Sequence, residues 1–559
     1  MRAGCEGWII AMWAVLASAI LCLPVAALLG QSVLIDDTFY ALAAARHLAA
    51  GDGSTVDGVH ATSGYQPLWV WLIAGVTALG RLSPEGTVRA ALVLCAACTL
   101  LCGLRLARLT RVLGGGGVTA GVALLLWLLN PYLLRRQFNG LESVLAAWLL
   151  VETVLWSLRL EAARGFGSWG RCGSDAGAQG AKRGSCGQAV SFAGGVGAER
   201  RMQAPMPAQP RALELGAGVL AGLAALARID LLILVPLLAL RRRWIAAGVA
   251  TVVSAPWLAW CWIRFGSPVP SSGQASRLMF AILHDLPEPG LLLWDSASVS
   301  FTFASLLGLG WPAAGLQRFG FPSALVWILV PLALLALWGL AAIGGGSKAR
   351  LKQWWVQSRA LARWMLPLAA YLGVAYALVY PAPWHLNRYF LPLHALFAVG
   401  LALYFGRGIL GHRWRQRLWW AAWGAGLVAG LTPYLIDTTG GQPPSLQLEV
   451  ARWIREEVPP DWRVAAIQSG VVGYYAARPI TNLDGKVNPL AFEALRSKRM
   501  WEYLELERID LFGDWEDLTE RFVFARAGSE VARLRTTRLS PQQAGAPARP
   551  FAFYRIARP

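Results

Sequence analysis

Two adjacent carboxylates, Asp36 and Asp37, stand just beyond the first apolar segment of the chain. They open the stretch 36–50, whose Ala-rich pattern predicts a helix ended by Gly51. An N-cap role explains one acidic residue here, but a second carboxylate at a lipid interface is costly unless it is paired or used. One carboxylate of such a pair can deprotonate a hydroxyl nucleophile while the other orients it, binds a cation or steadies the first. The pair is therefore the leading candidate for chemistry.

The elements that must position this pair cross a membrane. Of 559 residues, 56% are apolar and 15% are charged, and the mean hydropathy is +0.46, whereas soluble domains carry about 25% charged residues. Uncharged runs of about the length that spans a ~30 Å hydrocarbon layer recur along the chain, among them 8–29, 322–343, 364–380 and 418–436. The first run is too long for the apolar region of a signal peptide, so we expect it to be a retained span. The sequence predicts a polytopic α-helical membrane protein with about 10–12 membrane helices.

The distribution of charge argues against nucleic-acid binding, although the net charge is +19. Residues 437–559 hold 17 basic and 16 acidic side chains, whereas the first 436 residues hold 34 and 16. The basic excess lies in loops between apolar runs, for example 105–111 and 241–243. This pattern is typical of the cytoplasmic loops of a membrane protein.

The same rule predicts which segments lie on which side. Residues 1–436 form the transmembrane domain, with exported loops at 31–65 and 264–320 and a flexible, Gly/Ala/Arg-rich cytoplasmic insertion at 160–212. The run 67–80 has only 14 residues and opens with proline, so we expect it to re-enter the membrane rather than span it.

The tail, residues 437–559, is predicted to be a small exported α/β domain because strand and helix patterns alternate in it. The expected helices are 446–458, 471–477 and 488–507, and the expected strands are 463–468, 480–483 and 521–525. None of the eight cysteines lies in a segment placed outside, so no disulfide framework is expected. No His, Asp or Glu cluster has convincing metal-ligand spacing, and no glycine-rich nucleotide loop is present.

Several motifs resemble those of the GT-C glycosyltransferases, in particular the bacterial arabinofuranosyltransferase-like members and, more distantly, the protein O-mannosyltransferases. The first loop carries Asp-Asp-x-x-Tyr from Asp36 and Gly-Tyr-x-x-Leu-Trp from Gly64, which includes Gln66. Further matches, in chain order, are Asn139-Gly140-Leu141-Glu142, Ala227-Arg228-Ile229-Asp230, Arg264 to Pro270 followed by Arg277, Asn387-Arg388-Tyr389 and Asn482-Leu483-Asp484-Gly485-Lys486. Two departures are Ile229, where proline is common, and Arg277, where lysine is expected.

The resemblance implies an inverting transfer of a sugar from a polyprenyl-phosphate donor to a hydroxyl of a glycan, lipid or protein acceptor, at the exported face of a bacterial plasma membrane. It gives Asp36 the role of general base and Asp37 a supporting role. Arg277 and Arg388 suit the donor phosphate, since guanidinium groups match phosphate oxygens. The supporting residues are Glu142, Asp230, Gln66, His385, Asp484 and Lys486. No cofactor is assigned, and a divalent cation is left open.

Other interpretations fit parts of the pattern. Arg277 and Arg388 are also suited to anchoring lipid headgroups, Asp230 to pairing with Arg228, and His385 to an interfacial turn. Polytopic chains with carboxylates near the membrane include transporters, and a non-catalytic binder of lipid-linked sugar would keep most of the same residues. The large exported loops, the α/β tail and the retained acidic pair favour the enzyme.

Overall fold

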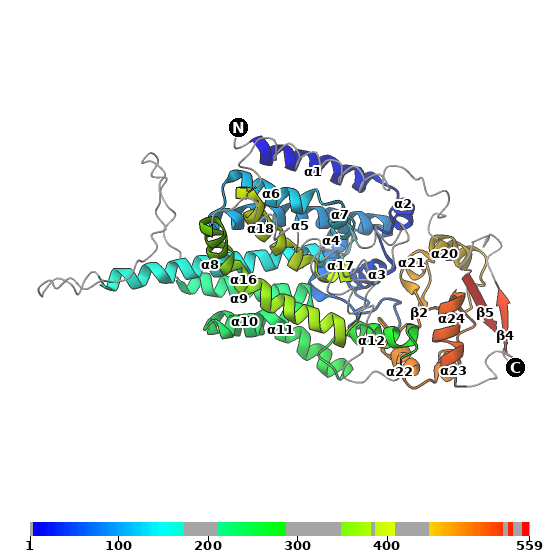
Figure 1. Ribbon diagram of the computed structural model, residues 1–559. Helices are drawn as coiled ribbons and strands as arrows, with labels where there is room; N and C mark the ends of the chain where they lie inside the picture. The colour runs from blue at the N-terminus through cyan, green and yellow to red at the C-terminus, as the bar shows by residue number, and fades with distance from the viewer. Residues whose placement is uncertain are drawn as a thin grey trace, which may run out of the picture.

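The computed structural model describes residues 4–172, 210–286, 348–381, 386–408, 446–528, 535–539 and 551–557. In these ranges the chain forms a bundle of apolar helices with a small α/β domain beside one end of it (Figure 1). This arrangement confirms the predicted fold class, a polytopic α-helical membrane protein with an α/β tail.

The bundle is mostly α-helical. The helices are α1 (Gly4–Cys22), α2 (Val25–Gly30), α3 (Asp36–Ala50), α4 (Pro67–Gly80), α5 (Pro84–Val112), α6 (Gly117–Leu128), α7 (Pro131–Gln137), α8 (Ser143–Cys172), α9 (Pro210–Ala227), α10 (Leu234–Leu240), α11 (Trp244–Phe265), α12 (Ser271–Leu283), α16 (Lys348–Val374), α17 (Leu386–Tyr389) and α18 (Leu391–Gly408). A 3₁₀ helix at Ile229–Ile233 precedes α10, and a π-helix at Ala375–Val379 ends α16.

Five helical segments among the described residues are long and apolar enough to cross a membrane. They are Pro84–Val112, Ser143–Arg164, Pro210–Ala227, Trp244–Phe265 and Ser358–Val379. Helix α4 has 14 residues, which corresponds to about 21 Å and is shorter than a ~30 Å hydrocarbon layer. Re-entry stays the prediction for this segment.

Small residues bring α9 and α11 close together. A Cβ atom at Gly218 would lie 2.6 Å from the carbonyl oxygen of Ala246, and one at Gly222 would lie 2.9 Å from that of Ala250. Glycines four residues apart let two membrane helices approach closely. This contact fixes the axis of α9, and therefore the position of Arg228 directly after it.

The tail is built around a five-stranded sheet in the order β2-β1-β3-β5-β4. Its strands are β1 (Val464–Ala466), β2 (Ile480–Asn482), β3 (Leu511–Trp515), β4 (Thr536–Leu539) and β5 (Phe551–Ile556), and its helices are α20 (Leu446–Glu456), α21 (Ser469–Tyr475), α22 (Pro489–Arg496), α23 (Met500–Leu506) and α24 (Glu516–Phe522). Strand β1 runs parallel to β2 and β3, whereas β5 runs antiparallel to β3 and β4. The α/β tail predicted from the alternating pattern is thus present.

Some local predictions for the tail are wrong. The expected strand at 521–525 is instead the end of α24 and a short 3₁₀ helix, and the strand of this region is β3 at Leu511–Trp515. The single helix expected at 488–507 is two helices, because Lys498 between them adopts a left-handed φ of 55°. A non-glycine residue in that conformation interrupts a helix.

Two predictions for the bundle are also corrected. The N-cap of α3 is Ile35, so neither Asp36 nor Asp37 caps its own helix. The first part of the insertion predicted as flexible at 160–212 belongs to α8, which continues to Cys172. The predicted spans 322–343 and 418–436, and the end of the loop 264–320, lie outside the described residues.

The predicted topology can be tested at two exposed positions. Glu456 lies on α20 in the tail, and Arg242 lies in the basic connection between α10 and α11. Helices α10 and α20 lie at opposite ends of the structure (Figure 1). We expect a cysteine at 456, in a chain without its native cysteines, to react with a membrane-impermeant maleimide in intact cells, and a cysteine at 242 to react only after lysis. Labelling of position 242 in intact cells would contradict the scheme.

Candidate functional site

The tail docks on the bundle through the N-terminal end of α3. The carboxylate of Asp36 accepts hydrogen bonds from the backbone N–H groups of Gly470 (3.2 Å) and Val471 (2.8 Å), in the first turn of α21. One turn further along α3, the hydroxyl of Tyr40 accepts hydrogen bonds from the backbone N–H of Ser469 (3.1 Å) and from Asn482 Nδ2 (3.2 Å). The first N–H groups of a helix have no partner within it and favour an anion. Asp36 therefore caps α21 across more than 430 residues of sequence.

Removal from solvent raises the pKa of Asp36, although the hydrogen bond from Val471 opposes this effect. Asp36 does not line the cavity described below. Its position matches an anchoring role better than the predicted role of a base.

Asp37, the next residue, points the other way, into a cavity. Its Oδ1 lies 3.1 Å from Lys486 Nζ, which follows β2 in the tail, and its Oδ2 lies 3.2 Å from Arg388 Nη2 on α17. Burial by itself would lower the pKa of Lys486, but attraction to Asp37 and Asp484 outweighs it and the pKa is raised. One carboxylate thus lies between two cations from distant parts of the chain.

Arg388 has capacity for a further anion. Its side chain is only 8% exposed, and its Nη2 donates to Asp37 and, at 3.2 Å, to the hydroxyl of Tyr389. Its Nε and Nη1 atoms are buried and have no hydrogen-bond partner among the residues that the structure describes. Unsatisfied buried donors on a charged group are costly, so an anion that reached them would be bound favourably.

A second cluster lies deeper in the same cavity, around Arg228. The Nε and Nη2 atoms of Arg228 donate to the two oxygens of Asp230 at 3.1 and 2.6 Å, and Nη1 donates to Glu142 at 3.2 Å. Tyr376, on the π-helix, donates its hydroxyl proton to Asp230 at 2.6 Å. The expected pairing of Asp230 with Arg228 is therefore present, and this guanidinium is saturated by two carboxylates.

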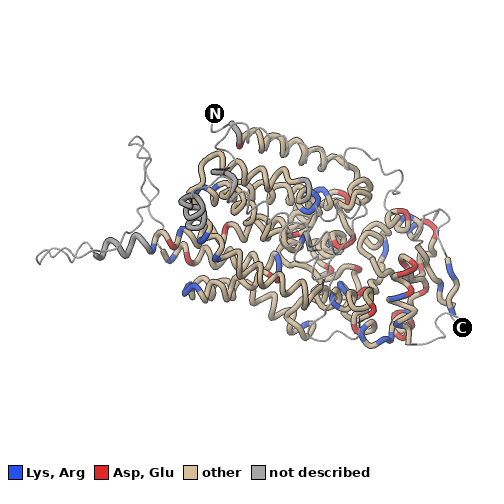
Figure 2. The backbone as a smooth tube through the Cα atoms, viewed as in Figure 1, with Lys and Arg blue, Asp and Glu red and all other residues tan. Residues whose placement is uncertain are grey.

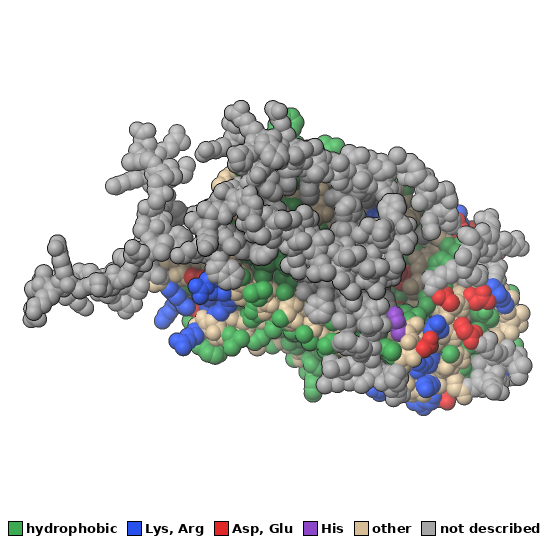
Figure 3. Space-filling view, viewed as in Figure 1, with side chains coloured by type: hydrophobic (Ala, Val, Ile, Leu, Met, Phe, Trp, Pro, Cys, Tyr) green, Lys and Arg blue, Asp and Glu red, His purple; other side chains and the backbone are tan. Residues whose placement is uncertain are grey.

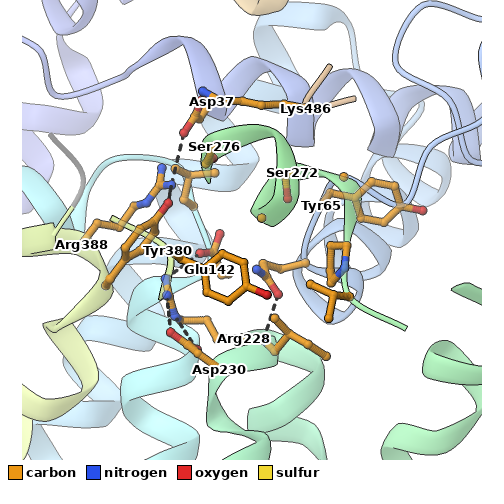
Figure 4. Close-up of a pocket in the computed structure, with 18 of the residues that line it drawn as sticks. Asp37, Tyr65, Glu142, Arg228, Asp230, Ser272, Ser276, Tyr380, Arg388 and Lys486 are labelled. Carbon is orange, nitrogen blue, oxygen red and sulfur yellow. Dashed lines mark hydrogen bonds and ion pairs between the residues drawn. The ribbon is translucent and has the colours of Figure 1, made fainter. Parts of the chain in front are cut away.

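These two clusters line one cavity of about 330 Å³ (Figure 4). Its wall also contains Tyr65, Trp69, Tyr371, Tyr380 and Tyr389, and the hydroxyl-bearing Ser272 and Ser276 of α12. The volume is at the lower end of the range of ligand cavities, about 300–1,000 Å³, and suits a small polar group. Tyr371 is 38% exposed and belongs to the candidate span Ser358–Val379, so the wall reaches the outer surface of a membrane helix.

The other residues predicted for the site are placed as follows. Gln66 lines the cavity and accepts a hydrogen bond from the backbone N–H of Ile229 at 3.1 Å. Asp484 is buried behind Lys486, whose backbone N–H it binds at 2.8 Å, and burial raises its pKa to about 6. His385 lies outside the described residues.

Arg277 is not part of this cavity. It lines a neighbouring cavity of about 420 Å³ together with Arg496, Lys498 and Arg526, and Tyr380 is common to both cavities. The structure therefore separates Arg277 from Asp37 and Arg388.

Sequence reasoning missed the aromatic part of the site. Tyr376 and Tyr389 stack with ring centroids 4.7 Å apart, and the Arg228 guanidinium lies 4.8 Å from the Tyr389 ring. Tyr389 belongs to the motif Asn387-Arg388-Tyr389 and could have been predicted as a site residue for that reason. Nothing in the local sequence distinguishes Tyr376.

The donor set does not fit a metal ion held by this chain. No group of three His, Cys, Asp or Glu side chains gathers in the part of the chain that the structure describes. Asp37 faces two cations, and Glu142 and Asp230 are bound to Arg228. A divalent cation prefers several free carboxylate or carbonyl oxygens, so no step is assigned to one.

Comparisons with known proteins place this site in context. Residues 438–542 match the family model "Domain of unknown function (DUF8728)", and no curated protein matches the chain in sequence. Among solved structures, the chain is similar to the oligosaccharyltransferase of Archaeoglobus fulgidus, with 13% identity, a TM-score of 0.49 and coverage of 92% of this chain and 71% of that one. It is also similar to ArnT from Cupriavidus metallidurans bound to undecaprenyl phosphate, with 15% identity, a TM-score of 0.43 and coverage of 98% and 99%.

The docking of α21 on α3 gives a stability prediction. A Cβ atom at Gly470 would lie 2.2 Å from the backbone oxygen of Asp36, whereas one at Gly473 would lie no closer than 3.6 Å to Ile480. We expect Gly470→Ala to lower the free energy of unfolding by about 1–3 kcal/mol through overpacking. Gly473→Ala, the matched control on the same helix, should be neutral or stabilise by up to about 1 kcal/mol. Thermal unfolding followed by tryptophan fluorescence measures both, and equal melting temperatures would contradict this account of the junction.

Proposed function

We propose that this protein is an inverting membrane glycosyltransferase that moves a sugar from a polyprenyl-phosphate donor to an acceptor hydroxyl, with Asp37 as the general base. The observation that carries the proposal is the pairing of one cavity-lining carboxylate with two cations, Lys486 and Arg388, that are suited to a phosphate. Because the cavity wall includes the exposed, membrane-helix residue Tyr371, a donor carried by a lipid has a route to it.

The proposed reaction is a single displacement. The acceptor hydroxyl gives its proton to Asp37 while its oxygen forms a bond to the anomeric carbon. The bond from that carbon to the phosphate oxygen breaks, and the electron pair leaves with the polyprenyl phosphate. Arg388 and Lys486 would stabilise the negative charge on that phosphate, as guanidinium and ammonium groups aimed at a leaving group do.

The ion pairs of Asp37 would link donor binding to the basicity of its carboxylate. In the proposed donor complex the phosphate oxygens take the free Nε and Nη1 atoms of Arg388 and compete with Asp37 for Nη2 and for Lys486. A carboxylate released from its cations is a stronger base, so donor binding would prepare Asp37 for the acceptor. The deeper cluster around Arg228 would provide hydrogen-bond acceptors for sugar hydroxyls, through Glu142 and Asp230.

The assignment of the base can be tested by exchanging the two adjacent acids separately. We expect Asp37→Asn to lose about 10²-fold or more in turnover, the usual contribution of a general base. Asp36→Asn should instead lower the melting temperature. Gly470 and Val471 donate to different oxygens of the Asp36 carboxylate, and the substitution replaces one of these oxygens with an NH2 group that cannot accept. Transfer by purified protein from a panel of labelled polyprenyl-phosphate sugars measures turnover.

The control for this experiment is Asp52→Asn, which changes an exposed carboxylate that pairs only locally with His47. It should leave both turnover and stability unchanged. If Asp37→Asn turned over at the wild-type rate, Asp37 would not be the general base.

The phosphate-binding role of Arg388 gives a second test. Lysine keeps the charge but lacks the planar set of donors, so Arg388→Lys should raise the KM for the lipid-linked donor by about tenfold or more, since a charge-assisted hydrogen bond contributes about 1.5–3 kcal/mol. The matched change Arg242→Lys, at an exposed arginine in the α10–α11 connection, should leave the KM unchanged. An unchanged KM in Arg388→Lys would mean that this side chain does not bind the donor phosphate.

A further inference from the structure

The end of the bundle away from the tail contains a second concentration of arginine. Where α8, the α10–α11 connection and α16 meet, a cavity of about 860 Å³ is lined by Arg164, Arg241, Arg243, Arg359 and Arg363, with Glu161 as the one acidic residue of its wall. Figure 2 marks basic positions along the backbone at this end of α8 and α10, the opposite end of the helices from α12 and the tail. Nothing in the proposed reaction uses them.

Arg243 shows that this cluster is more than a solvated surface. Its side chain is 3% exposed, and its Nη2 atom donates to Glu161 at 2.8 Å. Within the described part of the chain, its Nε and Nη1 atoms are buried without a hydrogen-bond partner. A buried, partly satisfied guanidinium is unfavourable unless an anion completes its hydrogen bonds.

The surrounding charges increase this demand for an anion. Arg241 stacks on Trp364 at 3.9 Å, which fixes its guanidinium at the cavity. Burial lowers the pKa of Arg243, and the neighbouring Arg164 lowers it further, while Glu161 opposes both effects. Among the described residues, the five arginines pair with two carboxylates, Glu161 with Arg243 and Glu214 with Arg164.

The rim of the cavity is apolar and faces outward. Leu366, which lines it, is 66% exposed, and the flanking Leu240 and Trp244 are 80% and 68% exposed. Leu240 ends α10, Trp244 begins α11, and Leu366 lies within the candidate membrane span Ser358–Val379 of α16. Figure 3 shows basic side chains beside a hydrophobic surface in this region. An anionic head beside exposed apolar helix surface is the chemistry of a membrane lipid.

We propose that this cavity binds the headgroup phosphate of an anionic phospholipid. The phosphate oxygens complete the hydrogen bonds of Arg243 and lie between Arg241 and the arginines of α16. The acyl chains follow the apolar surface of α10, α11 and α16. Basic pockets between membrane helices bind anionic lipid heads in this way, and the binding is independent of the glycosyl-transfer site.

The test compares lipids on the purified full-length protein. Native mass spectrometry in detergent, titrated with phosphatidylglycerol, phosphatidylcholine or inorganic phosphate, measures affinity, and tryptophan fluorescence measures the melting temperature with each. We expect retained phosphatidylglycerol and a higher melting temperature with it, little effect of phosphatidylcholine, and no comparable effect of inorganic phosphate. Equal effects of the two lipids would overturn the proposal, and equal protection by inorganic phosphate would show an anion site without a lipid.

Variants locate the binding. Arg243→Gln should weaken phosphatidylglycerol binding by about tenfold or more, the loss expected for a charge-assisted hydrogen bond. Arg242→Gln changes the exposed arginine next to it, which does not line the cavity, and should bind as the wild type does. The double variant Arg359→Gln/Arg363→Gln changes exposed lining residues, so it tests the cavity without disturbing a buried pair. Equal binding by Arg242→Gln and the double variant would overturn the site.

Discussion

The capping of α21 by α3 is the contact on which the site depends. Asp36 and Tyr40 take up the first backbone N–H groups of α21, and this fixes the tail against the bundle. The loop after β2 then delivers Lys486 to Asp37. Successive residues of a helix point about 100° apart, so two adjacent acids can serve two partners. One faces the tail and holds it, and the other faces the cavity.

The charges of the cavity are arranged in two different ways. Around Arg228 the ion pairs are complete, with Glu142, Asp230 and Tyr376 in fixed positions. Around Asp37 one carboxylate faces two cations, and two donors of Arg388 have no partner in the described ranges. A complete cluster supports the shape of the cavity, whereas an incomplete one has free energy available for binding an anion.

Burial and unbound donors also distinguish arginines that are suited to binding an anion from arginines that only contribute to the charge of a loop. Arg242 and Arg243 are adjacent and have the same charge. Arg242 is exposed, whereas Arg243 is buried with two donors that no described residue binds. Exposed arginines fit the positive-inside pattern and need no ligand. Buried, under-satisfied arginines occur at both ends of the bundle, at Arg388 and Arg243, and each lines a cavity.

The sequence by itself determined the class of fold and singled out six of the charged or polar residues that line the cavity. Apolar runs, the arginine distribution and the alternation of the tail predicted membrane helices and an α/β domain, because hydrophobic periodicity is a local property. Asp37, Gln66, Glu142, Asp230, Arg388 and Lys486 were all named from motifs, and the structure brings them to one cavity or its wall. The local pattern also predicted a strand at 521–525. This segment begins with the end of α24, and the strand, β3, precedes that helix.

Only the tertiary structure decided how those residues divide their roles. It directs Asp36 to the N-terminus of α21 and Asp37 to the cavity, and it places Arg277 in a neighbouring cavity. It also brings Tyr376 to Asp230 and leaves Arg243 buried and incomplete. Residue type and spacing predict none of these contacts, because each depends on a partner from a distant part of the chain.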